Sequence, residues 1–256
     1  MRRRTLLLAA GLAASFSRAA AEEPAAAGLQ ERRHRDRRWT CCRLDPAARR
    51  MDLFLSGAAG ILLRNFTELE RHVATLGRRV VVAMNGGMFE ADGSPVGWCV
   101  AEGRTIRQAN LKEGAGNFFL KPNGVFAVID GTALVMETTA AAGDPRLRHA
   151  RLITQSGPLL VAGARIHAGF KEDSLNRRVR NGVGVAADGK VWWGISEEEV
   201  SFHESATFFR DELGCPDALF LDGQVSRLHA PALGRKAGPC LLGPLLAVTE
   251  PVNPAK

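Results

Sequence analysis

The stretch "VVVAMNGGMFEADGSPVG", residues 80–97, joins an apolar run to a polar, glycine-rich turn. A continuous apolar run is typical of a strand that is buried on both faces. The same arrangement returns in "ALFLDGQVS", residues 218–226. Each run also follows a helix-like segment and a glycine, so we interpret the two stretches as a repeat of one local architecture.

Short turns along the rest of the chain indicate the fold class. Pairs of an acidic residue or asparagine with glycine separate segments that are rich in β-branched and aromatic residues, which is the pattern of two-residue hairpins. They occur at residues 102–103, 123–124, 130–131 and 188–189. We therefore predict an α+β fold, with mixed, mostly antiparallel sheets built from hairpins and a few packed helices.

Two segments have the start and stop signals of helices. In residues 65–77, Thr67 and Glu70 fit a capping box and Gly77 an end. Residues 201–214 repeat this design with Ser201, Glu204 and Gly214. Each helix is predicted to lead into one of the two buried strands.

The N-terminus has the features of a targeting segment. Residues 1–21 combine a basic start, a short apolar middle and small residues at Ala19 and Ala21, which predicts a signal peptide that is cleaved after Ala21. An uncleaved anchor is the alternative, and the short apolar part favours cleavage. We expect a flexible leader over 22–37, a single domain over 38–256, a periplasmic or secreted location and no stable membrane insertion after cleavage.

The chain carries a formal net charge of +7, and four of its arginines lie in residues 1–21. Much of the remaining excess lies in residues 31–43. A basic segment can bind nucleic acid or anionic lipid, but a solvated lead-in to the first strand is the simpler interpretation. We predict no nucleic-acid binding.

The five cysteines leave at least one thiol unpaired within the chain. Cys215 and Cys240 could form a disulfide, and the sequence leaves the pairing open. No Cys/His spacing indicates zinc.

Polar residues at the ends of apolar runs form the candidate site. Asn85 and Asp222 end the two repeated runs, and Ser156 and Gly157 follow a third. Glycines at such ends let a ligand approach the backbone and leave amide N–H groups free. One such turn is commonly only a turn, but three of them favour a shared site.

A cluster of arginines precedes a glycine-rich segment in "SLNRRVRNGVGV", residues 174–185. A guanidinium group matches the geometry of phosphate. We interpret Arg177 and Arg178 as solvated arginines at the edge of the structure. Arg180, which enters the apolar segment, is the better ligand candidate.

Six motifs occur in a fixed order along the chain: "AMNGGMF", "DGSPVG", "GNFFLKPNGVF", "QSGPLLV", "RNGVGV" and "LFLDGQVS". In this order they resemble the phosphodiester glycosidase family over about residues 38–248. That family includes the enzyme that removes N-acetylglucosamine from a sugar-phosphate diester. The resemblance is strongest to a bacterial, exported branch.

The resemblance implies a set of site residues. The implied catalytic residues are Asp222, Arg180 and Asn85, and the implied substrate-binding residues are Gly86, Gly87, Ser156, Gly157, Asn181, Gly223 and Ser226. The chain departs from the family where Gln224 and Val225 replace glycines, which gives the turn less backbone freedom. Asp92 is a candidate for a second carboxylate. The resemblance also allows a divalent cation such as calcium, although the sequence has no calcium loop.

The function that follows is an exported hydrolase that cleaves a glycosidic bond to phosphate in a sugar phosphodiester, in envelope or exopolysaccharide metabolism. Its partner would be a sugar-phosphate or glycan substrate. The alternative is a non-catalytic glycan-binding or polysaccharide assembly module of the periplasm, in which an outward Trp192 or Trp193 would stack on sugars. A structural envelope protein is the third hypothesis, and it predicts no deep cleft where Asn85, Arg180 and Asp222 meet.

Overall fold

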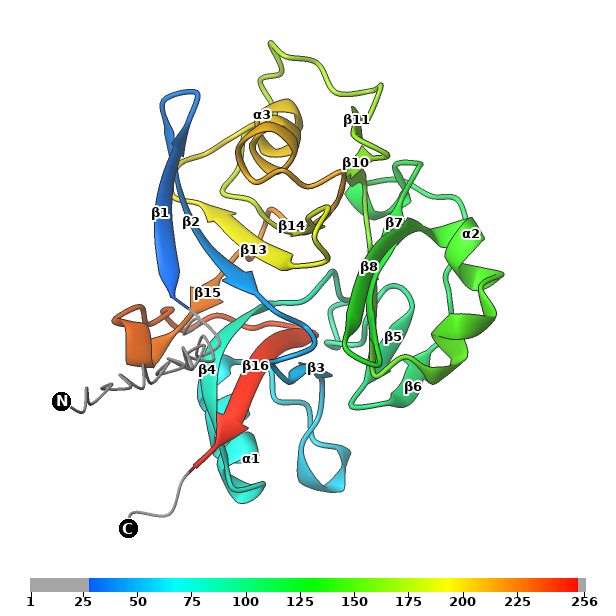
Figure 1. Ribbon diagram of the computed structural model, residues 1–256. Coiled ribbons are helices and arrows are strands. Elements are labelled where there is room, and N and C mark those ends of the chain that lie inside the picture. Colours follow the sequence, from blue (N-terminus) through cyan, green and yellow to red (C-terminus); the bar gives the residue numbers. More distant parts are fainter. Residues whose placement is uncertain (1–27, 253–256) are drawn as a thin grey trace, which may run out of the picture.

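The structure, a computed structural model, describes residues 28–252. Three sheets surround a shared interior (Figure 1), and every strand pair in this range is antiparallel. Mostly antiparallel sheets with few helices agree with the predicted α+β class.

The largest sheet has the order β1-β2-β13-β12-β14-β10-β11. Its strands are β1 (Leu29–His34), β2 (Arg37–Leu44), β10 (Leu159–Ala162), β11 (Arg165–Ile166), β12 (Asn181–Val185), β13 (Val191–Ser196) and β14 (Asp217–Asp222). The four-stranded sheet has the order β15-β4-β16-β3. Its strands are β3 (Met51–Phe54), β4 (Arg78–Asn85), β15 (Leu228–His229) and β16 (Leu245–Pro251).

The five-stranded sheet has the order β6-β5-β9-β7-β8. Its strands are β5 (Cys99–Ala101), β6 (Arg104–Arg107), β7 (Gly124–Ile129), β8 (Thr132–Glu137) and β9 (Leu152–Ser156). The helices are α1 (Phe66–Thr75), α2 (Thr138–Ala142) and α3 (Phe202–Thr207), and a π-helical turn, Phe208–Glu212, continues α3. Short 3-10 turns occupy Ala58–Gly60, Asn117–Phe119, Pro145–His149 and Pro231–Leu233.

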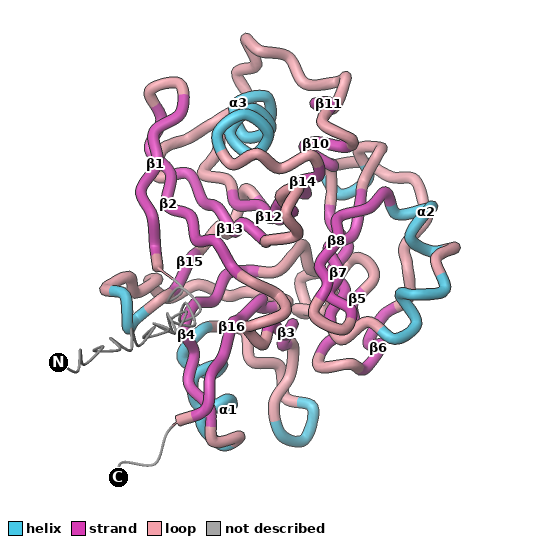
Figure 2. The backbone as a smooth tube through the Cα atoms, in the orientation of Figure 1, coloured by secondary structure: helices cyan, strands magenta, loops and turns pink. Residues whose placement is uncertain are grey.

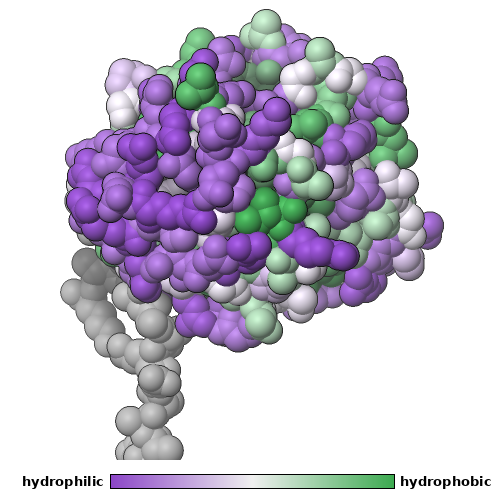
Figure 3. Space-filling model, turned by 90° about the horizontal axis from the view of Figure 1, so that it is seen from above, coloured by the Kyte–Doolittle hydropathy of each residue, from purple (hydrophilic) through white to green (hydrophobic). Residues whose placement is uncertain are grey.

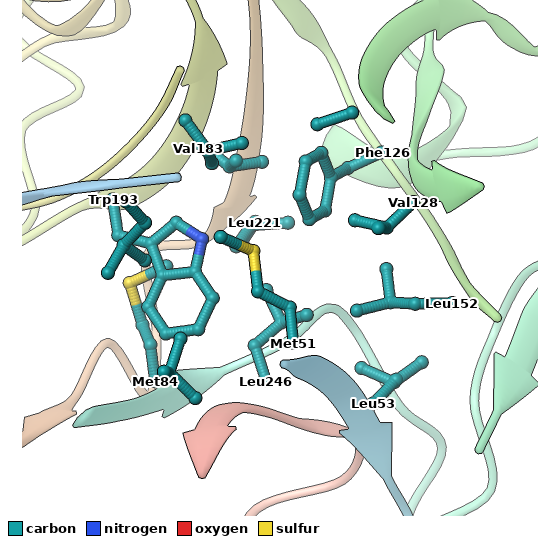
Figure 4. Packing of buried hydrophobic residues seen from close by; sticks show 14 of the residues in the cluster. Met51, Leu53, Met84, Phe126, Val128, Leu152, Val183, Trp193, Leu221 and Leu246 are labelled. Atoms are coloured by element: carbon teal, nitrogen blue, oxygen red, sulfur yellow. The ribbon is translucent and has the colours of Figure 1, made fainter. Parts of the chain in front are cut away.

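The main core lies where the inner faces of the three sheets meet (Figure 4). The seven-stranded sheet contributes Trp193 and Leu221, the four-stranded sheet contributes Met84 and Leu246, and the five-stranded sheet contributes Phe126. All are buried. One continuous core therefore fixes the sheets relative to one another.

Helical segments cover the outer faces of the sheets, and Figure 2 shows them at the periphery. Leu69 and Val73 of α1 pack on the four-stranded sheet. Phe208 and Phe209 pack on the seven-stranded sheet, and Leu147 packs with residues of the five-stranded sheet. Seen from above, the surface is mostly hydrophilic with a small hydrophobic group near its centre (Figure 3).

Glycines in β12 make room for the π-helical turn. A Cβ atom at Gly184 would lie 2.7 Å from Cys215 Sγ and 2.9 Å from Phe209 Cδ1. We therefore expect Gly184→Ala to lower the free energy of unfolding by about 1–3 kcal/mol through overpacking, measured by denaturant titration. Gly143→Ala is the control, because its nearest neighbour would be 3.6 Å away. Equal stability of the two variants would contradict this packing argument.

Three predicted hairpins are confirmed, at residues 102–103, 130–131 and 188–189. The hairpin at 123–124 is wrong. The segment before it forms a 3-10 turn instead of a strand, and the buried Asn123 side chain donates to Phe118 O at 2.9 Å. The capping box at Ser201 and Glu204 is confirmed.

Two other expectations need correction. The first helix is capped by Asn65, whose side chain accepts from Glu68 N, so Thr67 lies inside the helix.

Regular structure begins before residue 38, because the strand Leu29–His34 pairs with the strand that follows it. Some residues of this strand are half-buried and the others are exposed. Residues 1–21, predicted as a signal peptide, lie outside the described range. Within that range no helix is long and apolar enough to cross a membrane.

The disulfide considered between Cys215 and Cys240 is absent. All five cysteines are free, and four of them are buried. Burial raises the pKa of Cys41 to about 11 and that of Cys99 to about 12. These thiols are therefore core residues and not nucleophiles.

Candidate active site

The ends of β4, β12 and β14 meet at one seam between the seven-stranded and four-stranded sheets. Asn181 at the start of β12 is the register partner of Asp222 at the end of β14. The Asn85 side chain, at the end of β4, donates through Nδ2 to Asn181 Oδ1 at 3.1 Å. In return, Asn181 Nδ2 donates to Asn85 O at 3.1 Å. The structure thus brings together strand ends that are far apart in the sequence.

The side chains of the two asparagines form hydrogen bonds with other groups of the protein. Asn85 Oδ1 accepts from Arg227 N at 2.8 Å, so both ends of its carboxamide are occupied. Ser226 Oγ lies 3.2 Å from Asn181 Oδ1 and 2.8 Å from Asp222 O. Asn85, Asn181 and Ser226 are all buried. Their position indicates that they hold the turn after Asp222 in place.

Asp222 is buried and is held by that turn. Its Oδ1 accepts from Gln224 N at 2.6 Å and from Val225 N at 3.1 Å. Burial raises the pKa of the Asp222 carboxyl, because a charged group loses its hydration, and the backbone N–H groups partly offset this effect. A carboxyl group with a raised pKa in a cavity is typical of a functional site.

Asp222 lines a cavity of about 680 Å³. The polar residues in its lining are Glu90, Asn117, Asn176, Arg178, Asp222 and Gln224, and the remaining ones are Met88, Phe89, Ala91, Val96, Gly223 and Val225. The loop after β4 supplies most of the apolar lining. The segment before β12 and the turn after β14 supply most of the polar lining. A cavity whose lining is partly apolar and partly polar suits a sugar, because a sugar has both kinds of surface.

The arginines are placed only partly as expected. Arg178 is exposed, as a solvated edge requires, but it also lines the cavity. Arg180, the expected ligand, is buried and is absent from the lining. Its Nε donates to Val200 O at 2.9 Å and its Nη2 to Asn176 O at 3.0 Å. Arg177 pairs with Glu204 at 2.7 Å.

Arg180 nevertheless lies directly behind the cavity wall. A Cβ atom at Gly223 would be 3.1 Å from Arg180 Nη1 and 3.5 Å from Arg178 Cβ. Nη1 is buried without a hydrogen-bond partner, and no carboxylate among residues 28–252 forms an ion pair with this guanidinium. Burial and the nearby Arg178 lower the pKa of Arg180 to about 10. The Arg180 guanidinium is therefore a buried positive charge without an ion-pair partner among these residues.

Several predicted substrate-binding residues do not line the cavity. Gly86 N donates to Pro244 O at 2.7 Å, so the expectation of a free amide there is wrong. Gly87 has φ +144° and packs on Thr154. Ser156 Oγ donates to Leu221 O at 3.0 Å, and Gly157 packs against Asn123. Of the implied substrate-binding set, Gly223 lines the cavity.

The second carboxylate in the cavity is Glu90, which the sequence analysis missed. Asp92, the expected candidate, is exposed outside the lining, and its Oδ1 accepts from Ser94 N at 2.8 Å. The Asp-Gly-Ser sequence is a turn signal, and this signal would have assigned Asp92 to the turn and left Glu90 as the free acid.

The remaining expectations concern metals and tryptophans. No group of three His, Cys, Asp or Glu side chains that could hold a metal ion occurs among the described residues. Trp192 and Trp193 are both buried, and the guanidinium groups of Arg32 and Arg43 lie about 6 Å from the Trp192 ring. Neither tryptophan forms an exposed platform for sugars.

Known proteins share both sequence and fold with this chain. YigE of Escherichia coli K12, an uncharacterized protein, is 27% identical over 186 residues, which cover 73% of this chain and 72% of YigE. The catalytic domain of zebrafish N-acetylglucosamine-1-phosphodiester alpha-N-acetylglucosaminidase, auto-inhibited by its pro-peptide, matches with a TM-score of 0.60 and 16% identity. That match covers 86% of this chain and 81% of the zebrafish chain.

A hypothetical protein from Synechocystis matches with a TM-score of 0.52 and 14% identity, over 86% of this chain and 61% of its own. These structural matches show a shared fold. The family model for phosphodiester glycosidases matches residues 78–229, a range that contains both carboxylates and both arginines of the cavity region. The chain belongs to the phosphodiester glycosidase family.

Proposed function

We propose that the chain is a hydrolase that cleaves the glycosidic bond between a sugar and the phosphate of a phosphodiester. The observation that carries the proposal is the cavity that is lined by Asp222, whose carboxyl pKa is raised, and by Arg178, with Arg180 buried behind Gly223. Membership of the phosphodiester glycosidase family supports the same class of bond. The zebrafish enzyme is named for such a bond to N-acetylglucosamine.

The chemistry assigns one task to each charged group. The bond between the anomeric carbon and the phosphate oxygen breaks, and its electron pair leaves with the phosphate. Arg178 stabilises that negative charge, and Arg180 adds positive potential from behind Gly223. The ionised Asp222 stabilises the positive charge that develops on the sugar ring. Water then supplies the oxygen that bonds to the anomeric carbon, and its proton leaves to a base.

We further propose that the protein acts outside the cytoplasm, in envelope or exopolysaccharide metabolism. The basic and apolar pattern of residues 1–21 supports export. Cell fractionation of the native host with an antibody against the protein would test this placement, and recovery in the cytoplasmic fraction would contradict it.

A panel of donors tests the reaction. We expect turnover of sugar 1-phosphodiesters, measured by release of the free sugar, and no turnover of nitrophenyl glycosides of the same sugars, because these lack the phosphate that the arginines bind. Binding of the phosphodiesters without any turnover would instead support the non-catalytic glycan-binding module. Absence of both binding and turnover would overturn the proposal.

The arginine in the cavity wall gives a second test. We expect Arg178→Ala to raise KM about tenfold to a hundredfold, because a hydrogen bond to a charged group contributes about 1.5–3 kcal/mol. Arg104→Ala is the matched control, since Arg104 is an exposed arginine on β6 outside the cavity. Equal KM values for the two variants would show that Arg178 does not bind the phosphate.

A further inference from the structure

Glu90 lies on a short hairpin that enters the cavity. Glu90 N donates to Ser94 O, and Gly93 N donates to Glu90 O, both at 2.8 Å. A bridge between Phe89 and Pro95 closes the hairpin, and Val96 N donates to Met88 O at 3.1 Å. The backbone on both sides of Glu90 is therefore fixed by cross-hairpin hydrogen bonds.

The hairpin is also anchored to the rest of the molecule. Arg64 Nη1 donates to Asp92 O at 2.5 Å, next to Gly93, whose φ is +91°. Phe89 packs on Gly243, where a Cβ atom would lie 2.4 Å from Phe89 Cβ. The position of Glu90 relative to the cavity is consequently set by packing on two separate segments.

The Glu90 carboxylate is free to meet a ligand. Glu90 is exposed and lines the cavity. Within residues 28–252 its carboxylate forms no ion pair or hydrogen bond, whereas those of Glu68, Glu197 and Glu204 are all engaged. Asp222 and Glu90 are the two carboxylates in the lining, and they come from different segments.

We infer that Glu90 is a second catalytic residue of the reaction, the general base that accepts the proton of the attacking water. This inference rests on the proposed function. Asp222 is buried and bound by two backbone N–H groups, which suits a fixed negative charge beside the sugar ring. Glu90 is open to solvent, where the water must enter. The water oxygen bonds to the anomeric carbon, its proton passes to a Glu90 oxygen, and the phosphate leaves with the electron pair of the broken bond.

The test compares two acids on the same hairpin. We expect Glu90→Gln to lower kcat about a hundredfold or more, with KM changed less than about threefold, because general base catalysis contributes about 10²–10⁴-fold. Asp92→Asn is the matched control and should keep kcat within about twofold, since the asparagine oxygen can still accept from Ser94 N. The measurement is the steady-state rate on the sugar 1-phosphodiester that the wild type turns over fastest.

A rescue experiment separates catalysis from structure. Glu90→Ala opens space beside the anomeric carbon, and we expect added azide or formate to restore turnover of that variant, with a glycosyl azide formed in the azide reaction. The melting temperatures of all variants should match the wild type, because Glu90 is exposed.

The outcomes distinguish the two proposals. A wild type that turns over no sugar phosphodiester overturns the proposed function itself. A wild type that is active together with a fully active Glu90→Gln overturns the role of Glu90 alone. A slow Glu90→Ala variant that small anions do not restore also overturns it, since a mere loss of structure would give that result.

Discussion

Replacing Asp222 by asparagine is expected to lower kcat about 10²–10⁴-fold while leaving the fold intact. The amide removes the negative charge that stabilises the developing positive charge on the sugar ring. It keeps an oxygen that can accept the hydrogen bonds from Gln224 N and Val225 N. The turn after β14 should therefore keep its shape, and the loss should appear in kcat rather than in KM.

The same substitution is expected to change stability in a pH-dependent way. Burial raises the pKa of the Asp222 carboxyl in the folded protein above its unfolded value. Below the unfolded pKa the carboxyl is neutral in both states, and as pH rises through the folded pKa the native state loses stability. The asparagine variant has no such loss. We expect it to be as stable as the wild type in acid and more stable at neutral pH, by denaturant titration at several pH values.

Asp173→Asn is the matched control, because Asp173 is exposed and lies outside the cavity. It should change neither turnover nor the pH dependence of stability. For the wild type, activity should fall as pH drops through the raised pKa of Asp222, at a higher pH than an exposed aspartate would give. An Asp222→Asn variant with wild-type turnover would remove Asp222 from the mechanism.

Asn85→Ala is expected to lower the free energy of unfolding by about 2–4 kcal/mol. The substitution removes the hydrogen bonds to Asn181 Oδ1 and from Arg227 N, and it leaves the Arg227 amide without its partner. Each buried polar group left unpaired costs about 1–3 kcal/mol. Turnover should fall as well, because Arg227 belongs to the turn that positions Asp222.

A double-mutant cycle with Asn181→Ala isolates the contact between the two side chains. We expect the two losses of stability to be coupled by about 0.5–3 kcal/mol, since both substitutions break the hydrogen bond from Asn85 Nδ2 to Asn181 Oδ1. Strictly additive losses, measured by denaturant titration, would show that the two carboxamides do not act together.

Local features of the fold could be predicted from the sequence because local residues determine them. The turns at 102–103, 130–131 and 188–189 carry residues that accept positive φ, and they form hairpins. Pairings between distant segments could not be predicted. The neighbours of β14 are β10 and β12, and nothing in the residues near Asp222 specifies which strands these are.

The candidate site, too, could be predicted from the sequence only in part. Strand-end polar residues pointed to Asn85 and Asp222, and the structure places their strand ends at one seam. The sequence favoured Arg180 over Arg178, and it offered Asp92 as the second carboxylate where the cavity has Glu90. In both pairs the outcome depends on which side chain the backbone turns toward the cavity. The two arginines lie against Gly223 and Phe89 packs on Gly243, and both glycines are far away in the sequence.

The strand β16 is formed by residues 245–251 yet lies inside its sheet, between β3 and β4. During synthesis, β3 and β4 leave the ribosome long before the strand that joins them. The nascent chain must therefore carry two apolar strands with open edges until translation of this range is nearly complete, a condition that favours chaperone binding and aggregation. Truncation before residue 245 should accordingly yield inclusion bodies rather than a smaller folded protein.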